Sequence, residues 1–397
     1  MVNGRNNHID VPLLFSALTL MALSLGVVYS ASATWAMQKF GESEHLLNSH
    51  TWKILIGIAA LFIGMKINYR GHRRLTKPAL IIAVVLLVAT LMTGGEVKGA
   101  SRWLRIGSFG FQPSEFAKFA LLFHLCTLIA NKGELVRDFK KGFLPMMIWV
   151  GVVTLLVMLQ PNFSTGLMIV ILSLLVMFVG GARFSHLMLT FATLAPLILL
   201  YGLSAEYRMR RLTAFLDGSE LGTKTNYQLF QGIIGFGNGG LFGVGPGESK
   251  QRDFFLPESY GDFVFSIVGE EYGFIGTMIL VTLFVVIMIR GFKIAKFARD
   301  DFGYHLAAAI TSAITLYAIV NAGVTLGVLP TTGLPMPFVS YGGSSIVISA
   351  FAVGVLLNIS AHTDLHPRAV KVPVLGTVDA SGEEVESSGA VMVGKVH

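Results

Sequence analysis

The stretch VPLLFSALTLMALSLGVVYSASA at 11–33 contains no charged residue. An α-helix rises about 1.5 Å per residue, so a run of this length crosses the roughly 30 Å hydrocarbon core of a bilayer. In lipid the backbone must bond within its own segment, which favours a helix over an isolated strand. The run has no cleavage signal and is too long for the apolar part of a signal peptide. It therefore predicts a retained membrane helix.

Similar apolar runs recur along the chain, with short polar loops between them. The 397 residues are 53% hydrophobic and 13% charged, which is about half the charge of a typical soluble protein. The sequence predicts an all-α polytopic membrane protein with about ten transmembrane helices. The expected spans are 11–33, 52–67, 79–93, 115–131, 144–160, 164–180, 186–203, 264–290, 305–329 and 343–360.

The distribution of basic residues predicts the orientation of these spans. The short loops after spans two, four, six and eight hold fourteen Lys and Arg, against four in the loops after spans one, three, five and nine. The positive-inside rule then places both termini in the cytoplasm. We expect a cytoplasmic N-terminus (1–10), a membrane domain (11–360) with a long extracytoplasmic loop (204–263) between spans seven and eight, and a disordered cytoplasmic tail (361–397).

The net charge of +7 follows these loops rather than a nucleic-acid surface, because no basic stripe with interleaved aromatics occurs. We therefore expect no nucleic-acid partner. Cys126 is the one cysteine, which excludes an internal disulfide and a cysteine-rich metal site. We predict no protein metal centre and no resident cofactor, although a divalent cation could accompany an anionic substrate.

Polar residues cluster at three places on the expected outer side, and ionisable residues at membrane depth are candidates for function. The first cluster is GASRWLRIGSFGFQPSEFAK at 99–118. Arg102 and Arg105 oppose the positive-inside trend, which suggests an anionic ligand, although both could be interfacial anchors. Glu115 and Lys118 lie three residues apart on one helix face and can pair.

The second cluster is LPESYGDFVFSIVGEEYG at 256–273, which includes Glu258. Asp262 follows a glycine directly before span eight, where a substrate could approach, but it could also simply cap that helix. At 100° per residue, Glu270 lies about 80° and Glu271 about 180° round the helix from Asp262. The two glutamates therefore cannot both serve one site with this aspartate.

The third cluster is LPTTGLPMPFVSYGGSS at 329–345, between spans nine and ten. Its prolines and glycines predict a rigid, re-entrant-like turn, which is tolerated at membrane depth only where protein or a cavity covers it. Ser340, Tyr341 and the amides near Gly342 and Gly343 could donate hydrogen bonds to a phosphate or a sugar.

These clusters, together with YRMRRLTAF at 207–215 and GGLFGVGPGESK at 239–250, resemble the SEDS family (shape, elongation, division and sporulation). The resemblance covers about 10–360 and is nearest to the cell-division branch. Two positions depart from the family pattern. Ser259-Tyr260-Gly261 stands where His-Thr usually precedes the aspartate, and Asn162 stands where the family often has aspartate.

The resemblance implies a peptidoglycan glycosyltransferase that polymerises lipid II, a disaccharide-pentapeptide on undecaprenyl diphosphate, during septal wall synthesis. It implies Asp262 as the general base and Glu115, Glu258, Glu270, Gly342 and Gly343 as supporting residues. Contacts to the diphosphate or substrate are expected from Arg102, Arg105, Lys118, Arg208, Arg211, Ser340 and Tyr341. The expected partners are a class B penicillin-binding transpeptidase and other divisome membrane proteins.

Three other readings fit parts of the sequence. A lipid II flippase would also have many apolar spans and buried charges, but a transporter places its polar chemistry near the bilayer midplane. An elongation-type polymerase would share the reaction. A non-catalytic division scaffold would tolerate replacement of Asp262.

Overall fold

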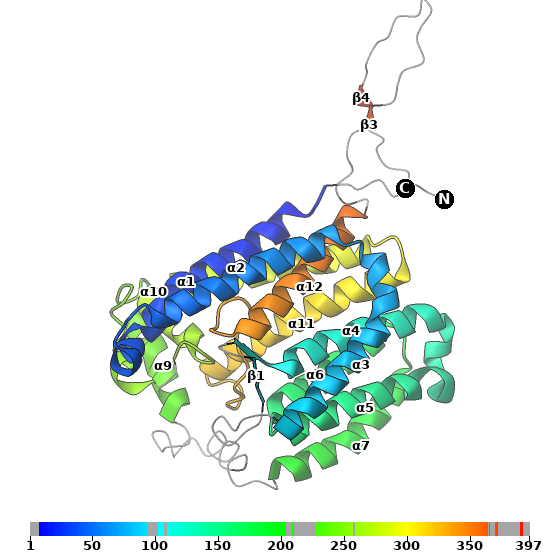
Figure 1. Cartoon of the computed structure of the whole chain (residues 1–397), viewed down its shortest axis with the longest axis horizontal. Helices are drawn as coiled ribbons and strands as arrows, with labels where there is room; N and C mark the ends of the chain where they lie inside the picture. Colours follow the sequence, from blue (N-terminus) through cyan, green and yellow to red (C-terminus); the bar gives the residue numbers. More distant parts are fainter. Residues whose placement is uncertain are drawn as a thin grey trace, which may run out of the picture.

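The computed structural model describes residues 8–93, 102–106, 109–203, 209, 227–256, 259–363, 365, 370–371 and 390–391. Within them, each expected span coincides with a helix (Figure 1). The helices are α1 (Val11–Phe40), α2 (His45–Lys66), α3 (Tyr69–Thr93), α4 (Pro113–Lys132), α5 (Leu144–Leu159), α6 (Phe163–Val179), α7 (Phe184–Leu203), α10 (Val264–Lys296), α11 (Asp301–Thr325) and α12 (Gly343–Ala361).

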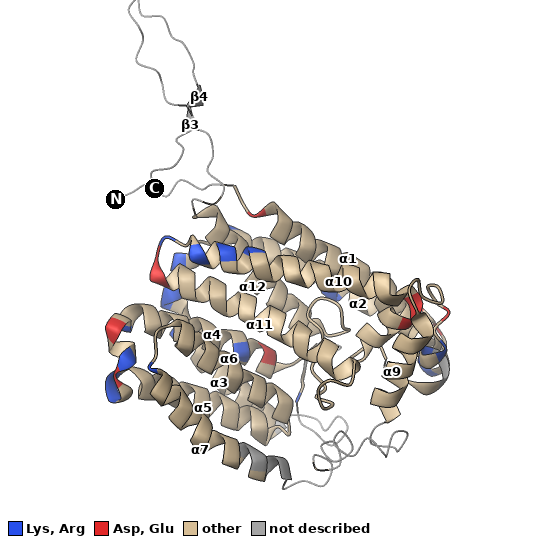
Figure 2. Ribbon diagram, turned by 180° about the vertical axis from the view of Figure 1, so that it is seen from behind, with Lys and Arg blue, Asp and Glu red and all other residues tan. Residues whose placement is uncertain are grey.

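Eight of these helices are long and apolar enough to cross a membrane, and α6 and α7 contain shorter apolar helices. The prediction of an all-α polytopic membrane protein is thereby confirmed. Charged residues lie mainly toward the two ends of the helices, and the middles are largely apolar (Figure 2). This distribution leaves a continuous apolar band for the bilayer core.

Local sequence explains where the helices begin and end. The carboxylate of Asp10 accepts a hydrogen bond from the amide of Leu13, which caps the start of α1. The helix ends at Gly41, whose φ of 78° needs a residue without a side chain. Helix α2 begins at His45, well before the predicted residue 52, and its first turns bury Leu46 and His50 in the bundle. His50 is buried there and bonds Ser24 of α1 at 3.0 Å.

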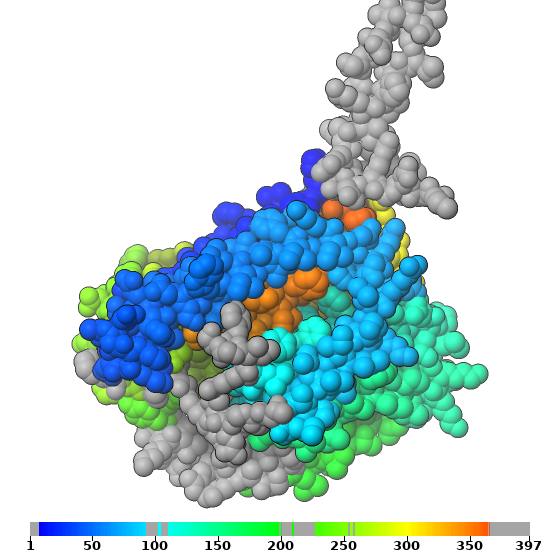
Figure 3. Space-filling view, in the orientation of Figure 1, coloured from blue at the N-terminus to red at the C-terminus, as the bar shows by residue number. Residues whose placement is uncertain are grey.

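The two last spanning helices form the centre of the bundle. The apolar window of α12 is 83% buried and that of α11 is 72% buried, against 28% for α2, α3 and α10. In the space-filling view, the middle of α12 (orange) lies at the bottom of a hollow between α2 and α3 (Figure 3). Gly64 and Gly354 allow α2 and α12 to touch, since a methyl group on Gly354 would lie 2.1 Å from the carbonyl of Leu61.

The long loop between α7 and α10 contains structure that the sequence did not predict. It holds helix α9 (Tyr227–Gly239) and a π-helical turn, η3 (Gln251–Phe255). The glycine-dense stretch after α9 bonds the backbone of α10, where the amides of Val244 and Gly245 donate to the carbonyls of Glu270 and Glu271 at 2.9 and 3.1 Å. Close approach is possible because α10 is broken at Gly273, with φ of 63°.

Smaller elements complete the described structure. A hairpin of β1 (Leu104–Ile106) and β2 (Phe109–Phe111) pairs Arg105 with Gly110 in the loop before α4. The turns η1 (Gly133–Arg137) and η2 (Phe139–Phe143) join α4 to α5. In the tail, β3 (Val370–Lys371) pairs with β4 (Ala390–Val391). The expected disorder of the tail concerns residues that lie mostly outside the described part.

Candidate functional site

Asp262 lies in the turn directly before α10 and is partly buried. Helix α10 has Phe263 as its N-terminal flanking residue and no side-chain cap, so Asp262 is not the residue that caps it. The amide of Asn321, near the end of α11, donates hydrogen bonds at 2.8 Å to the carbonyls of Asp262 and Leu334. One side chain thus fixes the aspartate turn against the loop between α11 and α12.

That loop contacts the aspartate through a glycine. A methyl group on Gly333 would lie 3.3 Å from Oδ2 of Asp262, and the φ of Gly333 is 75°. Only a glycine both adopts this backbone conformation without strain and leaves space beside the carboxylate. Phe338, also at positive φ, is fully buried in the same loop, and its packing keeps the loop rigid.

The third cluster, at 329–345, has a buried part and a more accessible part. The hydroxyl of Ser340 is buried and accepts a hydrogen bond from the amide of Met336 at 2.8 Å, so it stabilises the loop. Tyr341 donates to the hydroxyl of Ser49 at 3.1 Å, and its amide donates to the carbonyl of Tyr260 at 3.0 Å. Gly342 flanks the N-terminus of α12, whose first amides have no partner within the helix.

An aromatic and cationic group surrounds Tyr341. The Lys53 ammonium lies 3.6 Å from the centre of the Tyr341 ring, and its carbon chain packs on Gly343. Tyr260 meets Tyr341 edge to face at 5.6 Å and lies 5.4 Å from the ring of Trp35. Aromatic faces with a nearby cation suit a sugar or phosphate ligand. Sequence reasoning missed Lys53, although a lysine in an apolar run was a usable signal.

Glu115 and Lys118 form the ion pair that their spacing predicts, with Nζ and Oε2 at 2.9 Å and both side chains buried. The Lys118 ammonium also lies 3.8 Å from the centre of the Tyr317 ring of α11. Within the described residues it donates one hydrogen bond, to Glu115, whereas an ammonium has three N–H donors. Its other two N–H donors have no hydrogen-bond acceptor among the described residues, and the face of the Tyr317 ring lies against the ammonium.

Helix α11 brings Lys118 and Asp262 into one region. Tyr317, which contacts Lys118, and Asn321, which holds the aspartate turn, lie four residues apart and on the same helix face. Three buried polar atoms here have no partner among the described residues, namely the hydroxyls of Tyr317 and Thr332 and Oδ1 of Asn321. Buried polar atoms are rarely left unpaired, so the site is built for a polar ligand or water.

Arg102 is held by the turn between α5 and α6. Its Nε donates to the carbonyl of Gln160 at 3.3 Å, and its Nη2 donates to the carbonyl of Pro161. These contacts fix the guanidinium with part of its surface exposed. Arg105 lies in β1, but its side chain is outside the described structure, as are Arg208, Arg211 and Glu258 altogether. Their expected roles remain predictions.

Glu270 and Glu271 face the glycine-dense loop. Glu270 accepts hydrogen bonds from the side chain of Ser249, the amide of Gln251 at 3.3 Å and the side chain of Asn238 at 3.4 Å. Glu271 accepts from Ser30 of α1 and lies 3.6 Å from Arg252. Both carboxylates are buried, so they stabilise the loop that packs beside the aspartate turn.

No group of three His, Cys, Asp or Glu side chains within the described ranges could hold a metal ion. A divalent cation accompanying the substrate stays an open expectation.

The sequence and the fold both match known proteins. Residues 11–365 match the family of FtsW, RodA and SpoVE, described as "Cell cycle protein". The chain is 38% identical over 355 residues to a probable peptidoglycan glycosyltransferase FtsW of Geobacter metallireducens, covering 89% of this chain and 95% of the relative. It is 39% identical over 358 residues to stage V sporulation protein E of Bacillus subtilis, covering 89% and 97%.

Solved structures agree with this assignment. A chain from "Structural coordination of polymerization and crosslinking by a peptidoglycan synthase complex" superposes with a TM-score of 0.73 at 27% identity, covering 89% of this chain and 97% of that one. RodA of Thermus thermophilus superposes with a TM-score of 0.65 at 26% identity, covering 89% and 96%. The protein is therefore a member of the FtsW/RodA/SpoVE family, the SEDS family that its motifs resemble.

Proposed function

We propose that this integral membrane protein polymerises lipid II into glycan strands at the outer face of the cytoplasmic membrane, with Asp262 as the general base. The relatives named peptidoglycan glycosyltransferase make the chain an enzyme of that class. The observation that carries the proposed site is the convergence of Asp262 and Lys118 on one face of α11, beside buried polar atoms without partners.

The proposed chemistry needs a base at the acceptor. The 4-hydroxyl of the acceptor sugar is a poor nucleophile, and a positioned carboxylate can remove its proton. Asp262 takes this proton while the acceptor oxygen bonds C1 of the donor sugar and the bond from C1 to the diphosphate breaks. Direct displacement inverts the α-linked donor to a β-linkage. Gly333 supports this role, because a side chain at that position would crowd Oδ2 of Asp262.

The leaving group is a lipid-linked diphosphate, which develops negative charge as the bond breaks. Positive groups fixed at that position stabilise the transition state more than the ground state. Lys118 has two unused N–H donors within the described structure, and Arg102 is already oriented by two carbonyls. Arg105, Arg208 and Arg211 are further candidates from the sequence.

A partner is part of this proposal. One solved chain that resembles this protein belongs to a peptidoglycan synthase complex described as coordinating polymerisation and crosslinking. We infer that this protein likewise works beside a class B penicillin-binding transpeptidase. We also propose that it acts at the division septum with other divisome proteins, which the similarity to relatives named FtsW supports.

The decisive experiment is polymerisation of purified lipid II by the protein in liposomes, with and without its partner. Asp262→Asn keeps the size of the side chain, and we expect the rate to fall by about 10²–10⁴-fold, the usual contribution of general-base catalysis. Melting temperature and binding of the partner should stay unchanged. Normal polymerisation by this variant would remove Asp262 as the base, and lipid II transport without polymer would favour the flippase.

The orientation can be tested separately by cysteine labelling. With Cys126 replaced by alanine, a cysteine at the exposed Glu248 should react with a membrane-impermeant thiol reagent in spheroplasts. A cysteine at Lys296, at the end of α10, should react only after lysis. The opposite labelling would place Asp262 in the cytoplasm, where a polymerase of extracellular wall cannot act.

A further inference from the structure

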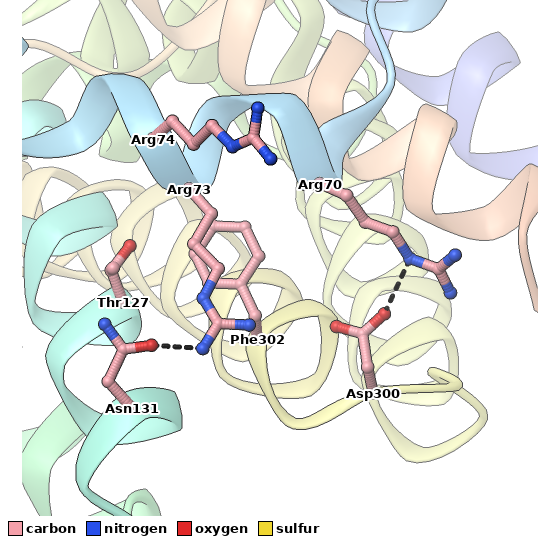
Figure 4. A pocket seen from close by; sticks show the side chains of 7 residues that line it. All are labelled: Arg70, Arg73, Arg74, Thr127, Asn131, Asp300 and Phe302. Carbon is pink, nitrogen blue, oxygen red and sulfur yellow. Dashed lines mark hydrogen bonds and ion pairs between the residues drawn. The ribbon is translucent and has the colours of Figure 1, made fainter.

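A basic cavity lies at the opposite end of the bundle from Asp262. It has a volume of about 580 Å³ and lies where α3 begins, α4 ends and α11 begins (Figure 4). A cavity of this size is in the range of small-ligand sites. Its charged lining is three arginines, Arg70, Arg73 and Arg74, against one acid, Asp300.

The three arginines differ in how many of their N–H donors are already bonded to other residues. Arg70 bonds Asp300 at 3.1 Å, and the same carboxylate accepts from the Tyr69 hydroxyl and, through its other oxygen, from the Gly303 amide. Burial raises the pKa of Asp300, but the hydrogen bonds from Tyr69, Gly303 and Arg70 outweigh it and leave the pKa below its usual value. Asp300 is thus an ionised, fully used carboxylate that fixes Arg70 in place.

The other two arginines retain donors for a ligand. Arg73 donates to the side-chain oxygen of Asn131 on α4, which orients the guanidinium toward the cavity (Figure 4). Arg74 has no hydrogen bond or ion pair with any residue that the structure describes. Guanidinium groups bind phosphate oxygens in a bidentate geometry, and several of them around one cavity suit a phosphate monoanion or dianion.

An apolar surface continues from the cavity along α3. Ile81 and Val85 follow Arg74 by seven and eleven residues, which places both within about 20° of Arg74 around the helix. Ile81 is 46% exposed and Val85 is 59% exposed. A free phosphate would use only the arginines, whereas a phospholipid would use the arginines and this apolar face together.

We propose that the cavity of Arg70, Arg73 and Arg74 binds the phosphate of an anionic phospholipid, whose acyl chains lie along Ile81 and Val85 of α3. Basic pockets between membrane helices recognise such headgroups on the cytoplasmic side. The assignment to the cytoplasmic leaflet rests on the proposed orientation, but the binding itself does not. The bound lipid would hold the ends of α3, α4 and α11 together. Two of these helices, α4 and α11, carry Lys118 and Tyr317 further along.

Native mass spectrometry of the purified full chain can test this, with phosphatidylglycerol and phosphatidylcholine of equal acyl length as probes. We expect preferential binding of phosphatidylglycerol and an affinity about tenfold or more weaker in Arg73→Gln/Arg74→Gln, since hydrogen bonds to charged groups are lost. The matched control is Lys140→Gln/Lys141→Gln, which removes the same charge from an exposed segment of the same end. This control should change the affinity less than about twofold, because exposed single charges contribute little.

Equal losses in both double variants would mean diffuse attraction and would overturn the site. Displacement of bound phosphatidylglycerol by millimolar inorganic phosphate would show that acyl chains contribute nothing, and it would overturn the lipid assignment. If the double variant does not fold, the affinity of Arg74→Gln for phosphatidylglycerol decides the question. This variant should fold, because Arg74 has no described partner to lose. These readouts measure binding, so they stand even if the proposed polymerase activity fails.

Discussion

Asp262 and Glu270 are acids in one short motif, yet the fold places them in opposite environments. Asp262 is partly exposed in a turn, and a glycine leaves space beside its carboxylate. Glu270, two helical turns along, is buried and accepts hydrogen bonds from three residues of the neighbouring loop. A substrate cannot reach a buried carboxylate that accepts several hydrogen bonds, whereas it can reach a partly exposed one. The difference in burial therefore fits a supporting role for Glu270 and the catalytic role proposed for Asp262.

Lys118 is the strongest challenge to this rule, because it is buried and paired but is proposed to act on substrate. Removing one partner of a buried ion pair costs about 3–5 kcal/mol, so Lys118→Met should lower the melting temperature strongly. The neutral pair Glu115→Gln/Lys118→Met should regain most of the stability. We expect this double variant to remain at least about tenfold slower in polymerisation, because the contact to the diphosphate is missing. Full recovery of the rate would make the pair purely structural.

Variants of Glu270 test whether this acid has only a structural role. Glu270→Ala leaves the Ser249 hydroxyl and the Gln251 amide without their acceptor, at about 1–3 kcal/mol for each unsatisfied group. Glu270→Gln retains a hydrogen-bond acceptor, so it should lower the stability less than Glu270→Ala. Thermal unfolding and polymerisation should be measured on both variants, and the rate per folded molecule should stay near normal. A stable Glu270→Gln protein without activity would give this acid a role in the reaction.

Asn321 carries the smallest expected effect on stability, and it acts on the rate through the positioning of Asp262. Asn321→Ala removes two hydrogen bonds between neutral groups, each worth about 0.5–1.5 kcal/mol. We expect kcat to fall by about five- to a hundredfold while KM for lipid II changes little, since the turn still forms but is less well fixed. The matched control is Asn358→Ala, which removes the contacts of α12 to Tyr69 and Met65 at the other end. Similar kinetic losses in both variants would indicate general loosening of the bundle instead.

The spans could be predicted because a run of apolar residues has one stable arrangement in lipid, and the bounds agree within four residues at α4, α5, α6, α7, α11 and α12. Helices α1 and α10 run seven and six residues beyond their predicted ends, and α3 begins ten residues before its predicted start. The exceptions have physical causes. The start of α2 was missed because His45 to Ser49 looked polar, and α9 was missed because glycines obscure a helical pattern in the sequence. The pairing of Glu115 with Lys118 followed from local spacing.

The tertiary parts of the site could not be predicted in this way. Asn321 reaches Asp262 across 59 positions of sequence, and no local pattern marks an asparagine as the link between two loops. Lys53 meets Tyr341 only because α2 packs on α12. The saturation of Glu270 likewise depends on a loop that approaches through its glycines.

The most enclosed spanning helix of the described bundle is also the last of them to be synthesised. While the ribosome still holds α12, the earlier helices surround an unfilled centre. At that stage the backbone amide of Tyr69 and the carbonyl of Met65 lack their hydrogen-bond partner Asn358, and the amide of Gln112 lacks Ser344. Until α12 is synthesised these polar groups lack their partners, so we expect a chain truncated before α12 to be unstable in the membrane.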